Sequence, residues 1–229
     1  MPVKQIEPLK KNGHIRQIDK WLVFAFAGIL FVLSQFYRSS VAVISPDLIR
    51  ELHLDSWELS TVSASFFYAF ALMQIPVGLF LDTIGPRITM TVLTLAAVAG
   101  ALVFSMGESY EVLTIGRMLL GIGMACNFMG GLKLLTIWFD SRVFATLSAM
   151  LVSIGTAGNI AAATPLVIMA QAVGWRYSFI LMAGLTLCIA LVFFLKVSDQ
   201  PGTGQAREPE PVSRPGIRDT VKSARVLFS

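Results

Sequence analysis

Three cations lie inside long apolar stretches of this sequence. Arg38 is far from either end of the apolar run 21–44, and Arg117 and Lys133 lie in later runs. An arginine at the centre of a membrane-spanning helix costs ~2.5–3.5 kcal/mol on insertion scales, so it is normally kept where it meets protein, water or an opposite charge. No carboxylate lies deep in any of these runs. Interior charges of one sign predict a path for an anion.

The elements that must position these cations are membrane-spanning helices. Of the 229 residues, 55% are hydrophobic and 14% are charged, whereas soluble domains carry about 25% charged residues. Apolar runs of about 18 residues or more recur along the chain, as expected for transmembrane helices. We expect an all-α membrane protein with spans at residues 21–45, 57–81, 88–106, 112–138, 143–170 and 176–196. Short links between them predict antiparallel neighbours in one bundle.

The distribution of basic residues predicts the orientation of the bundle. The side that holds both tails carries Lys4, Lys10, Lys11, Arg16, Lys20, Arg87, Arg142, Lys196, Arg207, Arg214, Arg218, Lys222 and Arg225. The opposite side carries Arg50 and Arg176. Basic residues accumulate on the cytoplasmic side of membrane proteins. We therefore expect a multi-pass protein of the plasma membrane, the inner membrane if the source is bacterial, with both tails in the cytoplasm. The net charge of +4 then needs no nucleic-acid partner.

The composition divides the chain into three segments. Residues 1–20 are read as a cytosolic tail and residues 21–196 as the six-span domain. Residues 197–229 begin with a linker rich in Pro, Gly, Glu and Gln. Apolar residues then recur at near-helical spacing, at Ile217, Val221, Ala224 and Phe228. This pattern predicts the start of an amphipathic helix that leads to a missing second half.

The link after the second span carries a motif. Gly78, Asp82, Gly85 and Arg87 have the spacing G-x-x-x-D-x-x-G-x-R, which resembles the loop signature of the major facilitator superfamily. The resemblance implies a latch between two six-helix halves, in which Asp82 and Arg87 pair with each other or with helix ends. Thr83 and Pro86 stand where that family usually has basic residues. The alternative is a tight polar turn.

The fourth span also resembles this superfamily, because Arg117 is an intramembrane arginine followed by Gly121 and Gly123. The resemblance implies a role in proton coupling or interhelical hydrogen bonds. The alternative is that Arg117 bonds backbone carbonyls and never meets substrate. At ~100° per residue, Arg117 and Lys133 face nearly opposite sides unless the helix is distorted between them.

The first span indicates the kind of substrate. The spacing of Trp21, Arg38 and Pro46 resembles the first helix of organophosphate and organic-anion transporters in the superfamily. The resemblance implies that Arg38 binds a phosphate or carboxylate, and a guanidinium fork matches such groups bidentately. Ser34 and Gln35 lie one turn earlier on nearly the same face. The alternatives are that Arg38 pairs with another helix or extends to the interface.

Four further polar residues are candidates for lining the path: Tyr68, Asn127, Lys133 and Asn159. Polar side chains in spans often bond a neighbouring helix instead, and Lys133 is close enough to a helix end to reach the interface. The third and sixth spans have few interior polar groups and are expected at the lipid-facing periphery, as the superfamily's two inverted three-helix repeats imply.

Together these features predict one six-helix half of a twelve-helix secondary transporter that moves a small organic anion, such as a sugar acid, organophosphate or carboxylate, by alternating access. Its expected partners are the anion, the bilayer and a carboxyl-terminal half. The alternatives are a non-transporting scaffold or sensor with a carrier fold, and a drug–proton antiporter. The fifth span lacks the glycine-proline pair of drug antiporters. No catalytic, metal or cofactor site is recognised, so an enzyme is not expected.

Overall fold

The computed structural model describes residues 11–199, apart from the side chains of residues 11–18 and 161–163. In this part of the chain the helices are α1 (Lys11–Leu52), α2 (Ser56–Thr83), α3 (Pro86–Ser105), α4 (Tyr110–Met124), α5 (Asn127–Trp138), α6 (Ser141–Val173) and α7 (Trp175–Lys196). Six segments are long and apolar enough to cross a membrane, because α4 and α5 together form one span, Tyr110–Trp138. The all-α architecture with six spans is confirmed. The amphipathic helix and the full extent of both tails lie outside the described residues.

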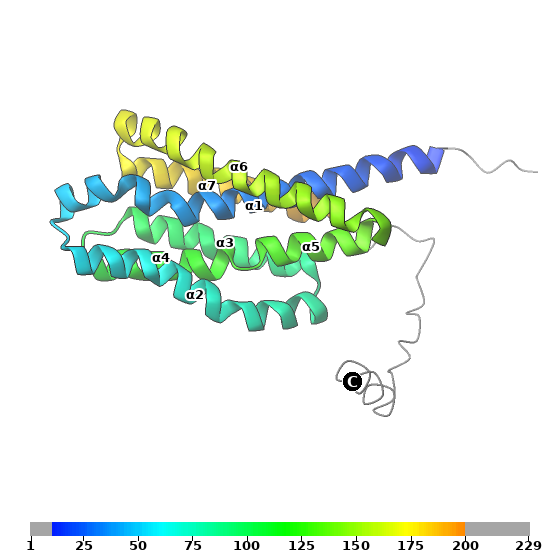
Figure 1. The fold of residues 1–229 in the computed structure, drawn as a ribbon, viewed down its shortest axis with the longest axis horizontal. Coiled ribbons are helices and arrows are strands. Elements are labelled where there is room, and N and C mark those ends of the chain that lie inside the picture. The colour runs from blue at the N-terminus through cyan, green and yellow to red at the C-terminus, as the bar shows by residue number, and fades with distance from the viewer. Residues whose placement is uncertain (1–10, 200–229) are drawn as a thin grey trace, which may run out of the picture.

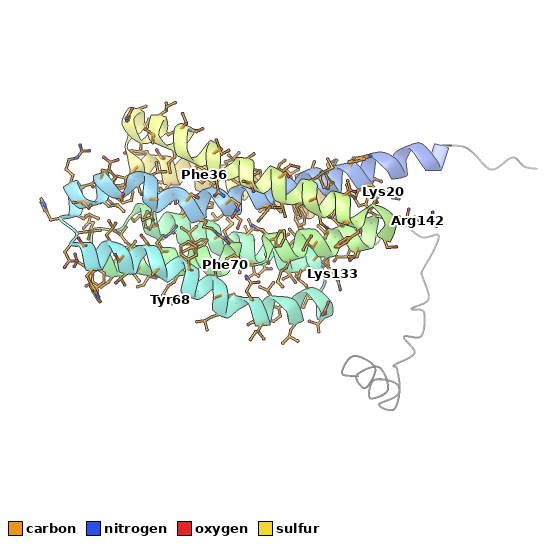
Figure 2. All side chains as sticks on the ribbon, viewed as in Figure 1. Lys20, Phe36, Tyr68, Phe70, Lys133 and Arg142 are labelled. Carbon is orange, nitrogen blue, oxygen red and sulfur yellow. The ribbon has the colours of Figure 1, made fainter. Side chains whose placement is uncertain are left out.

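The spans lie side by side in an elongated bundle with alternating direction (Figure 1). The start of α1, the α2–α3 and α5–α6 links and the end of α7 gather at one end, which we call the tail end. The α1–α2, α3–α4 and α6–α7 links gather at the opposite end. Lys20 and Arg142 lie toward the tail end (Figure 2). The grouping of these links agrees with the two sides that were predicted from the basic residues.

The first helix is longer than predicted. α1 begins at Lys11 and continues through Pro46 to Leu52, so the expected limits of 21 and 45 are wrong. A proline removes one helical hydrogen bond, but membrane-spanning helices tolerate this loss. A capping box starts the next helix: the Glu58 amide donates to Asp55 Oδ1 at 2.7 Å, and the Asp55 amide donates to Glu58 Oε2 at 2.9 Å. The link between the first two spans is therefore much shorter than the expected 46–56.

Close backbone contacts join α3 and α4. A Cβ atom built on Gly116 of α4 would lie 2.7 Å from the backbone nitrogen of Phe104 in α3, and one built on Gly100 of α3 would lie 2.7 Å from the nitrogen of Leu120. Small residues permit this approach, which membrane helices use in place of a hydrophobic driving force. α3 is consequently 61% buried along its apolar stretch. The expectation that the third span lies at the periphery is therefore wrong for the six-span bundle.

Three helices, α2, α6 and α7, leave most of their apolar stretches uncovered, and that of α7 is 33% buried. The apolar stretches of α2 and α6 are 28% and 27% buried, whereas those of the first and fourth spans are 56% buried. On α2 the uncovered side carries large apolar residues, including Leu72 and Ile75, which are 77% and 79% exposed. In a membrane-spanning bundle, such faces are covered by lipid or by other helices.

Candidate functional site

Arg38 lies in the middle of the first span and faces α2. Its side chain is half-buried, and the guanidinium carbon lies 4.6 Å from the centroid of the Phe70 ring and 5.9 Å from that of Phe67. Among the described residues no carboxylate pairs with Arg38, and its buried Nε atom has no hydrogen-bond partner. The predicted pairing with another helix therefore takes the form of ring contacts, and the charge itself is not neutralised.

Arg117 lies on α4 and is almost completely buried, at 1% exposure. Its NH1 group donates a 2.7 Å hydrogen bond to the backbone carbonyl of Tyr37, the residue before Arg38. Its guanidinium carbon lies 4.6 Å from the centroid of the Phe66 ring. This is the backbone-bonding alternative from the sequence. A role of Arg117 in conformational change stays a prediction.

Polar atoms without partners gather around the two arginines. Within the described part of the chain, four buried side-chain polar atoms lack a hydrogen bond, and three of them are Gln35 Oε1, Arg38 Nε and Arg117 Nε. Gln35 precedes Arg38 by three residues, so the two side chains share a face of α1. Buried polar atoms of this kind usually bind a ligand or an ordered water. This cluster is the strongest candidate site in the described bundle.

Ser34 and Asn127 occupy a different place, where the fourth span is broken. α4 ends at Met124 and α5 begins at Asn127. Ser34 Oγ donates to the Met124 carbonyl at 3.3 Å, and Asn127 Nδ2 donates to the Leu30 carbonyl at 3.3 Å. Both residues are buried, at 2% and 0% exposure. These bonds tie the break to α1. The contact of Ser34 and Asn127 with substrate stays a prediction.

The break between α4 and α5 lies between Arg117 and Lys133 in the sequence. Such a distortion was the condition under which both cations could face one cavity, yet they do not meet. Lys133 Nζ lies 2.7 Å from Asp82 Oδ1 and joins α5 to the end of α2. Figure 2 places Lys133 toward the tail end and Phe70 nearer the middle of the bundle. Lys133 is therefore part of the loop motif, which the sequence analysis did not foresee. The position of Lys133 near the end of the span was the sequence feature that could have indicated a contact at the tail end.

The remaining candidates for substrate contact lie on two other helices. Asn159 of α6 accepts a 2.7 Å hydrogen bond from Ser39 Oγ on α1. Tyr68 is 69% exposed on α2 and, two residues before Phe70, points away from the side that meets Arg38. Neither joins the cluster around Arg38, and their roles stay predictions.

The loop motif at the tail end is held by several contacts. Gly85 has a φ of 97°, which favours glycine, and lets the chain turn into α3. Arg87 donates from its backbone nitrogen to Asp199 Oδ1 at 2.7 Å and from Nε to the Phe194 carbonyl at 2.9 Å. Arg87 therefore bonds the end of α7, which was one of the two predicted arrangements. Gly78 and Asp82 line a hollow of about 370 Å³ beside Lys133.

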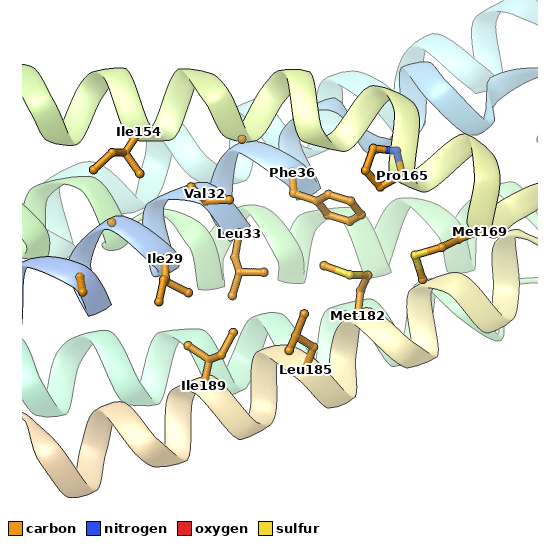
Figure 3. A pocket seen from close by; sticks show the side chains of 13 residues that line it. Ile29, Val32, Leu33, Phe36, Ile154, Pro165, Met169, Met182, Leu185 and Ile189 are labelled. Atoms are coloured by element: carbon orange, nitrogen blue, oxygen red, sulfur yellow. The ribbon is translucent and has the colours of Figure 1, made fainter. Parts of the chain in front are cut away.

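A larger cavity, of about 540 Å³, lies away from these residues, between α1, α6 and α7 (Figure 3). Its walls are apolar and include Val32, Phe36, Ile154, Met182 and Ile189. None of the predicted site residues lines it. Without a polar group it cannot orient an anion, so its size does not make it the substrate site.

The order of the six spans and the placement of the loop motif are those expected of a known superfamily. Residues 25–228 match the sequence model of the Major Facilitator Superfamily. The chain belongs to this superfamily.

Curated members of the superfamily have similar sequences. The uncharacterized transporter YybO of Bacillus subtilis is 27% identical over 199 residues, which cover 85% of this chain and 44% of that protein. The hexuronate transporter of Escherichia coli strain K12 is 27% identical over 187 residues, which cover 79% of this chain and 43% of that protein. The chain thus spans less than half the length of these superfamily members.

A solved structure shares the superfamily fold. It is that of a bacterial homologue of the human lysosomal transporter Spinster, in an inward-facing and unoccupied conformation. The two align with a TM-score of 0.74 and 15% sequence identity, covering 91% of this chain and 49% of the other. This likeness confirms the fold.

Proposed function

We propose that the protein is a secondary transporter that moves a small organic anion across a membrane by alternating access, with Arg38 as the anion-binding residue. The proposal rests on the environment of Arg38, which lacks an opposite charge among the described residues. Within the described bundle, this half-buried guanidinium has no acidic partner and keeps a buried Nε donor unused. A charge retained at such cost in a membrane span marks a functional site.

The names of the relatives support an anionic substrate. Besides hexuronate, curated relatives are named as transporters of sulfoacetate, D-galactonate and nitrate. All four compounds carry a planar or tetrahedral anionic group that a guanidinium fork can bind through two hydrogen bonds. A sugar acid or other small carboxylate is the substrate class that we propose for this chain.

We propose further that the six spans work with a second six-helix half. Two observations support this: the largely uncovered faces of α2 and α6, and the coverage of less than half of the relatives. The substrate would then bind between the halves near the middle of the membrane. The loop motif around Asp82 and Arg87 would hold the tail end closed in one of the alternating states.

The tail end is proposed to face the cytoplasm, because the basic residues concentrate there. Single cysteines placed at Ser141 and Tyr177, which are exposed at the tail end and the opposite end respectively, would report the orientation. A membrane-impermeant thiol reagent added to intact cells should label the cysteine at 177 and spare that at 141. The reverse pattern would show that the bundle is inverted.

The proposed function is tested by uptake into proteoliposomes. The protein, expressed from its complete reading frame, would be supplied with labelled D-galacturonate, D-galactonate, sulfoacetate or nitrate, with and without a pH gradient. Arg38→Lys should lower uptake by about tenfold or more, because lysine lacks the planar fork. The matched control is Arg50→Lys, on the same helix at an exposed ion pair with Asp47, which should stay within about twofold. Equal uptake by wild type and Arg38→Lys would exclude the proposed role of Arg38.

Absence of uptake for every anion, in a protein that is folded and inserted, would favour the scaffold or sensor alternative over a transporter.

A further inference from the structure

The two interior arginines rest on two aromatic rings of the same helix. Arg38 lies over Phe70 and Arg117 lies over Phe66, each with its guanidinium carbon 4.6 Å from the ring centroid. The two rings stand one turn apart on α2 and stack on each other, with centroids 6.0 Å apart and an angle of 19° between planes. Phe66 and Phe70 therefore form a continuous apolar support between the two cations.

A ring and an anion use different parts of a guanidinium. An aromatic face attracts the cation above it, through the negative charge of the π system. A carboxylate instead binds in the guanidinium plane, along the N–H edges. The Phe70 ring lies 4.6 Å from the guanidinium carbon of Arg38 and uses none of its N–H groups as a hydrogen-bond donor to an oxygen. The buried Nε of Arg38 has no hydrogen-bond partner among the residues that the structure describes. Because arginine can stack and form a fork at the same time, it suits this position better than lysine.

We propose that Phe70 is a positioning residue, whose ring holds the Arg38 guanidinium so that its N–H edges point to the substrate anion. This inference rests on the proposed function. A free arginine side chain has many rotamers and tends to extend toward the membrane interface. Holding it in the binding geometry before the anion arrives lowers the entropy lost on binding.

The backbone of the same site is held separately by Arg117. Its hydrogen bond fixes the Tyr37 carbonyl, one residue before Arg38, while the Phe70 ring fixes the Arg38 side chain. Arg117 is buried at 1% exposure, whereas Arg38 is half-buried, so Arg38 is the more accessible of the two arginines. One arginine thus supports the position of α1, and the other remains open to the anion.

The inference predicts a specific kinetic effect of removing the ring. Phe70→Leu and Phe70→Met retain an apolar side chain without a π face. In proteoliposomes we expect the KM for the transported member of the anion panel to rise by about threefold to thirtyfold, the range of a cation–π contact. The maximal rate should change by less than about twofold, because α1 and α2 belong to the same half, which alternating access moves largely as a rigid body.

Two controls separate positioning from general packing. Phe70→Tyr keeps the aromatic face and should retain a KM within about twofold of wild type. Phe67→Leu removes a neighbouring ring that is 48% exposed and 5.9 Å from Arg38, at the outer limit of such contacts, and should raise the KM by less than Phe70→Leu does. A loss of packing alone would lower the amount of folded protein and leave the KM unchanged.

The outcomes distinguish this inference from the proposed function. If wild type transports an anion and both ring-free variants keep its KM, Phe70 does not position Arg38 and the proposed function stands. If wild type transports none of the four anions, both proposals fail. If Phe70→Leu does not fold, Phe70→Met and Phe70→Tyr decide the question: equal KM values for these two would overturn the positioning role.

Discussion

The middle of the bundle and its two ends treat positive charge differently. In the part of the chain that the structure describes, the ion pairs are Arg50–Asp47 and Arg176–Glu51 at the opposite end and Lys133–Asp82 near the tail end. The arginines in the middle have aromatic rings and one carbonyl as partners. Two of these three ion pairs, Lys133–Asp82 and Arg176–Glu51, connect different helices. The neutral partners in the middle leave cationic charge to attract a solute.

The largest effect is expected when a carboxylate is introduced beside Arg38 in the middle of the bundle. Gln35→Glu places a carboxylate on the same face of α1, one turn before Arg38. At ~4 Å the attraction is about 4 kcal/mol for an effective dielectric constant near 20, enough to compete with a substrate anion. We expect uptake to fall by about tenfold or more. Gln35→Leu, which adds no charge, should be milder; equal loss in both variants would contradict charge competition.

The next effect concerns the close packing of α4 against α3 beside Arg117. Gly116→Val would push a side chain into the backbone of Phe104, and overpacking of this kind costs about 1–3 kcal/mol. The matched control is Gly184→Val on α7, where a Cβ meets nothing within 4 Å. Thermal unfolding in detergent should show a lower midpoint for the first variant. Identical midpoints would mean that α3 and α4 can separate without cost.

A moderate effect is expected at the loop motif. Asp82→Lys and Lys133→Asp each place like charges at the ion pair between α2 and α5. Each should lower the uptake rate by about threefold, since both groups are partly exposed and solvent weakens the pair. The double exchange should restore most of the rate, because the pair re-forms with reversed direction. Additive losses in the double variant would show that this pair does not support the transport cycle.

The smallest effect is expected at the opposite end. Glu51 accepts hydrogen bonds from Trp175 Nε1 at 2.6 Å and from Arg176 Nε at 2.9 Å, so it joins α1 to α7. Glu51→Gln keeps the shape and removes the charge, which should cost about 1 kcal/mol or less at this exposed site. Unfolding measurements should detect a small loss, with the KM unchanged. A rise in KM would mean that the contacts of Glu51 with α7 also affect the geometry of the anion site.

The sequence alone was sufficient to predict six membrane spans, because length and hydropathy determine spans directly. Short links and the charge asymmetry then determined the antiparallel order of the helices. The expected span ended at residue 45, just before Pro46, whereas α1 continues through this proline to Leu52. A membrane span tolerates a proline in its interior. The burial of α3 was missed because glycines such as Gly100 and Gly116 bring backbones together, and composition does not show which helices approach each other.

The candidate site was only partly predictable. Arg38 was singled out because a charge in an apolar run is costly, and Gln35 because it lies one turn earlier on nearly the same face. The rings of Phe66 and Phe70 were not singled out, since phenylalanine is common in membrane spans and only its contact with a guanidinium reveals its role. Lys133 was a candidate for lining the path, with extension to the interface as the alternative, and its partner Asp82 comes from a helix distant in sequence. The pairing of polar groups depends on tertiary contacts that one sequence does not specify.

The most direct test of the central claim is equilibrium binding of the four anions to the purified protein. Isothermal titration would compare wild type, Arg38→Lys and Arg50→Lys, each expressed from the complete reading frame. We predict that at least one anion binds wild type and Arg50→Lys with similar affinity, and that Arg38→Lys raises its Kd by about tenfold or more. An anion that binds wild type and Arg38→Lys equally well would contradict the account.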